Sequence, residues 1–428
     1  MRWLLALLLF VFSAVQAAGQ SASLMGPTSA EPLFDDSVLH DITLNIASSD
    51  WATLRATYLE NTYYPADFRW RTNVVRNIGI KSRGSGSRSG VKPGLKVDFA
   101  RYTTDQTFLG LKSIVLRNNT QDPSNLRERL SMLLFQRMGL PASREAHTRL
   151  FINGEYFGLY TVVEPLDKAF LRRTFGDDSG WLYSYEYPPD ASPFYFEDRG
   201  DDPNTYVPVP FTPETKESDP RGDLIVRWVQ AISQTADGVF RDVIGQFIDL
   251  PRLLRHVAIE AYLGDDDGFL GNWGMNNFYT YRFPGTTRFT VLPWDKSDAF
   301  MAGPAASIWH NITDVPPHQQ NRLMTRVLRY ADLYAAWLTD LDECVTITME
   351  LDPAAPDAPG WLEREIEREY AQVRLAALAD TVKPYTNEQF EQAVEDLRTF
   401  ARERGVAVAA EVARARSRAG LLRSMRPR

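Results

Sequence analysis

The segment Phe-Thr-Val-Leu-Pro-Trp-Asp at residues 289–295 is an apolar run that ends on a carboxylate. Its β-branched and aromatic residues, closed by a proline, are typical of a buried strand, which would present Asp295 at its end. A similar run begins just upstream, so the region is predicted to form a strand pair near residues 277–292. Asp295 is therefore the first candidate functional residue.

A second candidate lies upstream, in the acidic run Gly-Asp-Asp-Asp-Gly-Phe at residues 264–269. Three adjacent carboxylates at the end of an apolar helix repel one another unless a cation or a proton relieves them. Asp267, the nearby Asn277 and the strand-borne Asp295 together match the residue set that protein kinases use as catalytic base and as ligands of two magnesium ions. A calcium-stabilised or solvated acidic turn is the alternative interpretation of the run.

A third candidate is the loop Arg-Gly-Ser-Gly-Ser-Arg at residues 83–88, which follows the strand-like residues 78–81. Glycines let a backbone approach an anion closely, and serine hydroxyls and backbone N–H groups can hold phosphate oxygens. The next predicted strand, residues 94–99, carries Lys96. A glycine loop followed by a strand lysine is how kinases hold the phosphates of a nucleotide. On the loop alone, a Gly/Ser hairpin with exposed charges is the alternative.

The order of patterns along the chain predicts an α+β fold. Short alternating runs indicate a sheet-rich N-terminal lobe over residues 38–165. Residues 166–428 are mainly helical by their apolar periodicity. Within that lobe, residues 186–222 are rich in Pro, Asp and Glu, which predicts a long surface loop or insertion.

The N-terminus has the pattern of a secretory signal peptide over residues 1–18. Residues 4–15 are an apolar run too short to span a bilayer, and small residues allow cleavage after Ala17 or Ala18. A short membrane anchor is the alternative. We expect a flexible leader at residues 19–37 and a secreted or periplasmic protein with no integral membrane span after cleavage.

Composition excludes several classes of protein. The chain of 428 residues is 44% hydrophobic and 24% charged, which is ordinary for a globular protein with a full core. The net charge of -8 argues against a general nucleic-acid partner. Cys344 is the only cysteine, so no internal disulfide can form. The sequence holds neither HExxH nor GxSxG, the simplest signatures of zinc and serine hydrolases.

Several motifs along the chain together resemble one family. They lie at residues 74–87, 116–119, 122, 126–128, 139–141, 152–160, 163–164, 167, 264–269 and 293–295. The most distinctive are Ile-Asn-Gly-Glu-Tyr-Phe-Gly-Leu-Tyr at 152–160 and Pro-Trp-Asp at 293–295. On these motifs the chain resembles the spore-coat protein H (CotH) kinase-like family, as a secreted bacterial member.

The resemblance implies an atypical, reduced protein-kinase-like fold with two lobes. It implies an enzyme that uses ATP with Mg²⁺, or Mn²⁺ as the alternative metal, to phosphorylate hydroxyls of an exported or cell-surface protein. Carried over position by position, it assigns catalysis to Asp267, metal binding to Asn277 and Asp295, and ATP binding to Arg83, Gly84, Ser85, Ser87, Lys96 and Glu164. Lys92 lies close by and is the alternative to Lys96.

Two positions depart from the family pattern. Asp265 stands where a neutral residue is expected, and it would add negative charge near a phosphate. Ser184 stands where a lysine is expected. A second hypothesis therefore accompanies the first: a non-catalytic secreted structural or interaction protein with a kinase-like fold and a calcium-binding acidic loop. Retention of the glycine loop and Lys96 favours the phosphotransferase, because a calcium scaffold needs neither.

Overall fold

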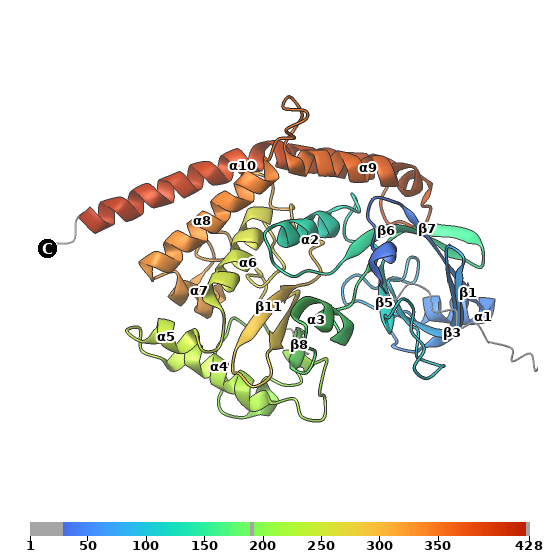
Figure 1. Ribbon diagram of the computed structural model, residues 1–428, viewed down its shortest axis with the longest axis horizontal. Helices are drawn as coiled ribbons and strands as arrows, with labels where there is room; N and C mark the ends of the chain where they lie inside the picture. The colour runs from blue at the N-terminus through green and yellow to red at the C-terminus, as the bar shows by residue number, and fades with distance from the viewer. Residues whose placement is uncertain (1–28, 189–191, 425–428) are drawn as a thin grey trace, which may run out of the picture.

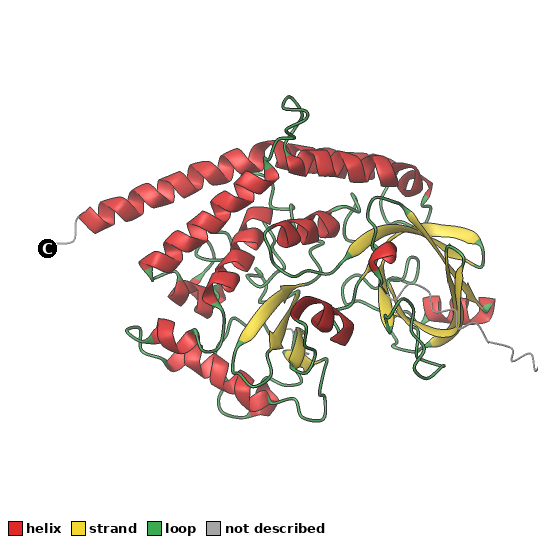
Figure 2. Cartoon of the chain, in the orientation of Figure 1, coloured by secondary structure: helices red, strands yellow, loops and turns green. Residues whose placement is uncertain are grey.

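The computed structural model describes residues 29–188 and 192–424 (Figure 1). The expected signal peptide and the first part of the expected leader lie outside these residues. Helices and sheets both occur, as the α+β expectation requires (Figure 2). No helix within the described residues is both long and apolar enough to cross a bilayer.

The N-terminal part of the chain forms a closed barrel in the strand order β1-β2-β3-β4-β5-β7-β6. The strands are β1 (His40–Ile46), β2 (Tyr64–Trp70), β3 (Asn73–Ser82), β4 (Leu95–Asp98), β5 (Ser113–Arg117), β6 (Glu145–Ile152) and β7 (Glu155–Val163). Neighbouring strands pair antiparallel except β1 and β6, whose parallel pairing closes the barrel. Closure leaves no free sheet edge. The expected sheet-rich region is present, but its closure into a barrel was not predicted.

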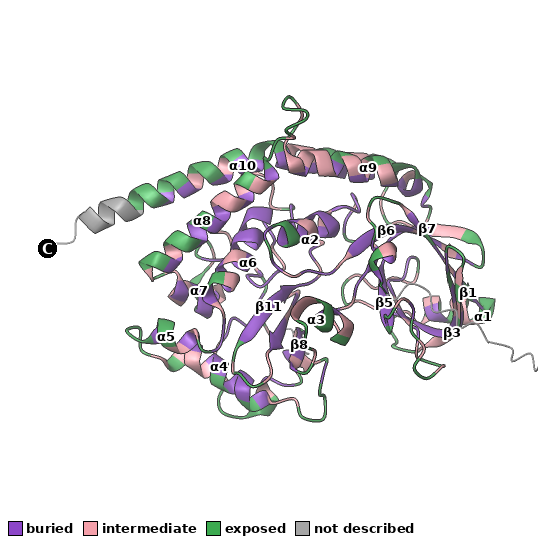
Figure 3. Ribbon diagram, in the orientation of Figure 1, coloured by how far each residue is buried: buried purple, intermediate pink, exposed green. Residues whose placement is uncertain are grey.

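A second sheet lies beside the helices, in the order β11-β10-β8-β9. Its strands are β8 (Trp181–Tyr185), β9 (Phe211–Pro213), β10 (Phe278–Arg282) and β11 (Phe289–Pro293). β10 and β11 pair antiparallel, so the predicted strand pair is confirmed. Every residue of β11 is buried, as its apolar run predicts (Figure 3). The strand therefore delivers Asp295 from the interior.

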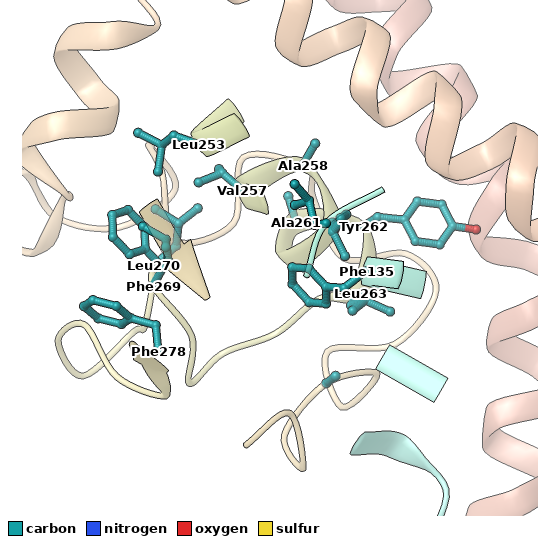
Figure 4. Packing of buried hydrophobic residues seen from close by; sticks show 14 of the residues in the cluster. Phe135, Leu253, Val257, Ala258, Ala261, Tyr262, Leu263, Phe269, Leu270 and Phe278 are labelled. Atoms are coloured by element: carbon teal, nitrogen blue, oxygen red, sulfur yellow. The ribbon is translucent and has the colours of Figure 1, made fainter. Parts of the chain in front are cut away.

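Helices build the rest of the chain. They are α1 (Ser48–Ala56), α2 (Arg127–Arg137), α3 (Lys168–Phe175), α4 (Gly222–Gln234), α5 (Phe240–Ile244), α6 (Leu250–Leu263), α7 (Arg322–Val327), α8 (Ala331–Thr348), α9 (Trp361–Ala379) and α10 (Asn387–Ser424). α6 lies in the main core, where its apolar side chains gather with Phe135 of α2 and Phe278 of β10 (Figure 4). α9 packs on β7, and α10 packs on α8 and extends past the helical body (Figure 1).

Two helices begin with side-chain caps. The Asp249 carboxylate accepts a hydrogen bond from the Arg252 N–H at 3.2 Å, at the start of α6. Before α10, Gln389 Oε1 accepts from the Thr386 N–H at 2.8 Å, and the Gln389 N–H donates to Thr386 Oγ1 at 3.2 Å. This reciprocal pair is a capping box.

Two irregular segments are more tightly packed than expected. In the described part of the leader, Leu33 and Phe34 are buried in the barrel core, so this part is not a loose tail. Residues 186–188 and 192–222 are mostly irregular, but they also supply β9 and a set of buried aromatic residues. That set is Phe194, Tyr195, Phe196, Tyr206 and Phe211. The proline and acidic content of the segment predicts a loop, but its aromatic residues pack in the main core.

One buried ion pair joins the barrel to the C-terminal helices. Lys92, just before β4, contacts Asp380, just after α9, with 2.8 Å between Nζ and Oδ2. Both side chains are 1% exposed. Asp380 also accepts a hydrogen bond from the Leu159 N–H at 3.0 Å. A Cβ added at Gly158 would lie 2.8 Å from the Asp380 carboxylate, which explains the glycine in the 152–160 motif.

The pair predicts a large effect of Asp380→Ala on stability. Removing the carboxylate leaves the Lys92 ammonium buried without a counter-ion, which costs about 3–5 kcal/mol. Urea unfolding monitored by circular dichroism measures the loss. Asp396→Ala on α10 is the matched control, because this aspartate is exposed and its removal should change stability by less than about 0.5 kcal/mol. Equal stability of the two variants would contradict the assignment.

Candidate active site

A cleft of about 510 Å³ lies between the barrel and the second sheet. Its volume is within the range of about 300–1,000 Å³ that is typical of small-molecule sites. Its lining includes Arg83, Gly84, Ser85, Ser87, Lys96, Asp267, Asn277 and Asp295. Every site residue predicted from the sequence therefore faces one cavity, with the exception of Glu164.

The glycine loop is held in a fixed shape at the mouth of the cleft. Gly84 has a φ of 112°, and a Cβ there would lie 2.5 Å from Ser87 Oγ, so the position requires glycine. Arg88 donates back to the Gly84 carbonyl at 2.8 Å and to the Leu59 carbonyl at 2.7 Å. Asn118 Nδ2 donates to the Ser87 carbonyl at 2.9 Å. The second arginine of the loop thus braces the loop.

Positive charge lines the barrel side of the cleft. Lys96 on β4 lies opposite Lys81 on β3, and both face the cavity with Arg83. Burial lowers the pKa of Lys81, and the charge of Lys96 lowers it further. Clustered cations of this kind repel one another and favour an anionic ligand. The prediction missed Lys81, although it lies next to the last residue of the strand that leads into the loop. Lys92, the alternative to Lys96, is paired with Asp380 and does not line the cleft.

Asp267 lies on the opposite wall, between two asparagines. Asn276 Nδ2 donates to its Oδ1 at 2.9 Å, and Asn277 Nδ2 donates to its Oδ2 at 2.8 Å. The Tyr187 hydroxyl is 3.4 Å from Oδ1. Burial raises the pKa of the Asp267 carboxyl to about 6, against the lowering effect of the Asn276 hydrogen bond. The carboxylate is thus oriented by neutral donors and is not neutralised by a cation of the protein.

Asp295 follows β11 in the left-handed conformation, with a φ of 48°. Its Oδ2 is 2.6 Å from Arg117 Nη1, and its Oδ1 accepts from Ser297 Oγ at 3.2 Å. Burial alone would raise the pKa of this carboxyl, but Arg117 and Arg83 outweigh the burial and the pKa is lowered. The carboxylate therefore keeps its charge in the cleft.

The three carboxylates of the acidic run point to three different partners. Asp265 contacts the buried Lys296 at 2.8 Å, and Asp266 pairs with His310. Asp267 alone of the three lines the cleft with the glycine loop. The repulsion is therefore relieved by protein groups, and Asp265 does not bring an unpaired charge toward a phosphate. Among the described residues, no group of three or more His, Cys, Asp or Glu side chains converges as a metal site.

Two further positions differ from expectation in what they contact. Glu164 does not line the cleft; it is buried between Arg144, at 2.6 Å, and Arg173, at 2.7 Å. Its carboxylate is fully engaged in holding β7 to α3, so the assignment of Glu164 to ATP binding is not supported. Ser184 does line the cleft, and its hydroxyl donates to Glu214 at 2.8 Å.

A second groove of about 630 Å³ meets the cleft at Asp267 and Tyr187, which line both. Its other lining residues include Tyr195, Asp298, Met301 and Trp273. Trp273 is 79% exposed, an unusual state for an indole side chain. Asp267 is thus accessible from two sides, from the basic cleft and from an open groove with aromatic and acidic walls.

Comparisons with known proteins agree with the geometry. The family model described as CotH kinase protein matches residues 80–408. The chain is 25% identical over 220 residues to Inner spore coat protein H of Bacillus subtilis (strain 168), covering 51% of this chain and 58% of that protein. It is 25% identical over 252 residues to Invasin CotH3 of Rhizopus delemar, covering 54% of this chain and 40% of that protein. The chain thus spans about half the length of these curated relatives.

Among solved structures, the Helicobacter pylori proinflammatory kinase CtkA aligns with 10% identity over 76% of this chain and 95% of that chain. The TM-score is 0.29, a value too low to establish a shared fold. The family model, in contrast, covers well over half of the chain and includes the glycine loop, the acidic run and the end of β11. The protein therefore belongs to the CotH kinase protein family.

Proposed function

We propose that this protein is an ATP- and Mg²⁺-dependent phosphotransferase with an atypical, reduced kinase-like fold, and that it phosphorylates hydroxyls of an exported or cell-surface protein. Family membership supports a kinase-like, nucleotide-using enzyme. The observation that carries the finer proposal is the gathering of Asp267, Asn277, Asp295, Lys96 and the glycine loop around one cleft.

The residues of the cleft fit a nucleotide with its phosphates toward the barrel. Lys96, Lys81 and Arg83 provide positive charge beside the glycine loop. Charge-assisted contacts of this kind are the strong hydrogen bonds to phosphate. Tyr279 and Trp294 supply aromatic surface in the same cavity. Bound there, the nucleotide would supply the phosphoryl group for transfer.

The opposite wall fits a magnesium ion that is shared with phosphates. Mg²⁺ takes one or two carboxylates of the protein together with waters and substrate phosphates, and needs no cage made only of protein. Asp295 offers a carboxylate that stays ionised, since Arg117 and Arg83 outweigh the effect of burial on its pKa. The side-chain amide N–H of Asn277 donates a hydrogen bond to Asp267. The side-chain carbonyl oxygen of Asn277, Oδ1, would then serve as a ligand for the cation.

We assign the role of catalytic base to Asp267. Its neutral donors fix the carboxylate without satisfying it by an ion pair, so it can accept the proton of a hydroxyl. An acceptor hydroxyl would approach from the second groove, while the nucleotide approaches from the first. Asp267 is where the two cavities meet.

The direct test is transfer of label from γ-labelled ATP, with Mg²⁺ or Mn²⁺, to the protein itself or to a candidate exported protein. A thermal-shift assay with ATP and metal is run in parallel. We expect both label transfer and a metal-dependent rise in melting temperature. Absence of both would refute the phosphotransferase, whereas a rise without transfer would point to a nucleotide-binding protein that lacks turnover.

Lys96→Ala should weaken ATP binding without unfolding the protein. Loss of one charge-assisted contact to phosphate costs about 1.5–3 kcal/mol, which is roughly a 10- to 100-fold loss of affinity. Calorimetric titration with a non-hydrolysable ATP analogue measures it. Lys112→Ala is the matched control, because this lysine is exposed and lies outside the cleft. Equal affinities of the two variants would show that Lys96 does not contact phosphate.

Asp267→Asn and Asp295→Ala should fail in different ways. Asp267→Asn keeps the shape of the side chain and loses its basicity, so nucleotide binding should persist while kcat falls about 10²–10⁴-fold. Asp295→Ala removes the ligand of the cation, so the metal-dependent part of nucleotide binding should disappear. Titration and label transfer on both variants separate the two roles. An equal loss of binding in both would make Asp267 a second metal ligand.

A further inference from the structure

Arg117 forms an ion pair with Asp295 and does not itself line the cleft. Its Nη1 is 2.6 Å from Asp295 Oδ2, and its Nε contacts the Glu128 carboxylate. The Arg117 and Glu128 side chains are each 8% exposed, whereas Asp295 is 22% exposed. The arginine is thus an interior residue, and the aspartate is the member of the trio that reaches the cavity.

The guanidinium is held in place from several directions. β5 supplies Arg117, and Glu128 lies in the first turn of α2. The Trp294 ring centroid is 5.1 Å from the guanidinium carbon. Such a planar group, fixed at both ends, restricts the plane of any carboxylate bound to it. Asp295 cannot turn Oδ2 into the cleft without breaking this ion pair.

The other oxygen of Asp295 is only weakly engaged. Oδ1 accepts one hydrogen bond, from Ser297 Oγ at 3.2 Å, and a hydroxyl can rotate away when a better partner for Oδ1 arrives. The ion pair therefore divides the carboxylate into two ends. Oδ2 is bound to the interior, and Oδ1 is left for a ligand.

We propose that Arg117 is the positioning residue of the cation site: it fixes Asp295 so that Oδ1 is presented to the divalent cation, and Glu128 of α2 orients Arg117. The proposal rests on the proposed function, because the cation is the one that accompanies the nucleotide. The proposal adds to the site a residue that does not line the cleft. It also makes the orientation of Asp295 depend on Glu128 at the start of α2.

A competing role for Arg117 makes the opposite prediction. If Arg117 were merely a stand-in cation that occupies Asp295 until a metal arrives, its removal would free the carboxylate and raise the affinity for the metal. If it positions Asp295, its removal lets the carboxylate turn and lowers that affinity. Loss of an outer partner of a metal ligand typically lowers metal affinity about 10- to 100-fold. The sign of the change therefore decides between the two roles.

The experiment measures Mn²⁺ affinity by electron paramagnetic resonance on the full-length protein with a non-hydrolysable ATP analogue. We expect Arg117→Gln to weaken Mn²⁺ binding about 10- to 100-fold and to leave metal-free binding of the analogue unchanged. Arg117→Lys keeps the charge but replaces the planar, forked guanidinium with a single ammonium on a flexible stem, so it should be intermediate. Unchanged or tighter Mn²⁺ binding in Arg117→Gln overturns the proposal.

Two controls keep the result interpretable. Arg117→Gln leaves Glu128 buried without its arginine, so the double variant Arg117→Gln/Glu128→Gln, which removes both groups together, is measured beside it and should show the same weakening. Arg129→Gln is the matched control, because Arg129, on α2, is likewise a buried arginine in an ion pair, 2.7 Å from Glu369, but does not contact Asp295. Equal weakening in Arg129→Gln would indicate general damage and overturn the proposal.

The outcome also separates this proposal from the proposed function. A wild-type protein that binds no Mn²⁺ with the analogue refutes both. A wild-type protein that binds Mn²⁺, with Arg117→Gln binding equally well, refutes the positioning role alone and leaves the phosphotransferase standing.

Discussion

The ammonium group of Lys296 is the buried charge on which the geometry of the site depends. It is fully enclosed, 2.7 Å from Glu260 of α6 and 2.8 Å from Asp265 of the acidic run. Glu260 also accepts from the Phe269 N–H at 3.0 Å, so the run wraps around its carboxylate. Three charges buried together tolerate little displacement, since separating any one leaves an uncompensated charge. Because Lys296 adjoins Asp295 and Asp265 is near Asp267, this cluster sets the positions of both site aspartates.

The features that could be predicted from the sequence are those that depend on residues close together along the chain. The burial of 289–293, the pairing of β10 with β11 and the caps of α6 and α10 follow from local periodicity and capping, and they are present. Asp267, Asn277 and Asp295 were found because their order along the chain matches a known set. Lys296 and Arg117 were not singled out, because a basic residue in a buried strand end has no local signature. The role of such a residue is set by its ion-pair partners on other elements.

Distance along the chain accounts for the remaining differences. The barrel closes through parallel pairing of β1 with β6, in which His40 lies opposite Thr148, and no local pattern specifies such a contact. Glu164 matches the family pattern in sequence, but its carboxylate forms ion pairs with two arginines from separate segments. Lys92 and Lys96 are chemically identical and close in sequence. Only the three-dimensional environment makes one a structural cation and the other a cleft residue.

The ion pair between Lys92 and Asp380 limits where the chain can be cut into separate parts. The residues that line the cleft all precede position 300, so the chain could be taken for a compact N-terminal unit followed by a separate helical part. The counter-ion of Lys92, however, comes from after α9. Any natural gene fusion, splice or split of this chain between the cleft residues and Asp380 would therefore separate a buried charge from its partner. The stability of the barrel is therefore coupled to the segment that follows α9, although the two lie far apart along the chain.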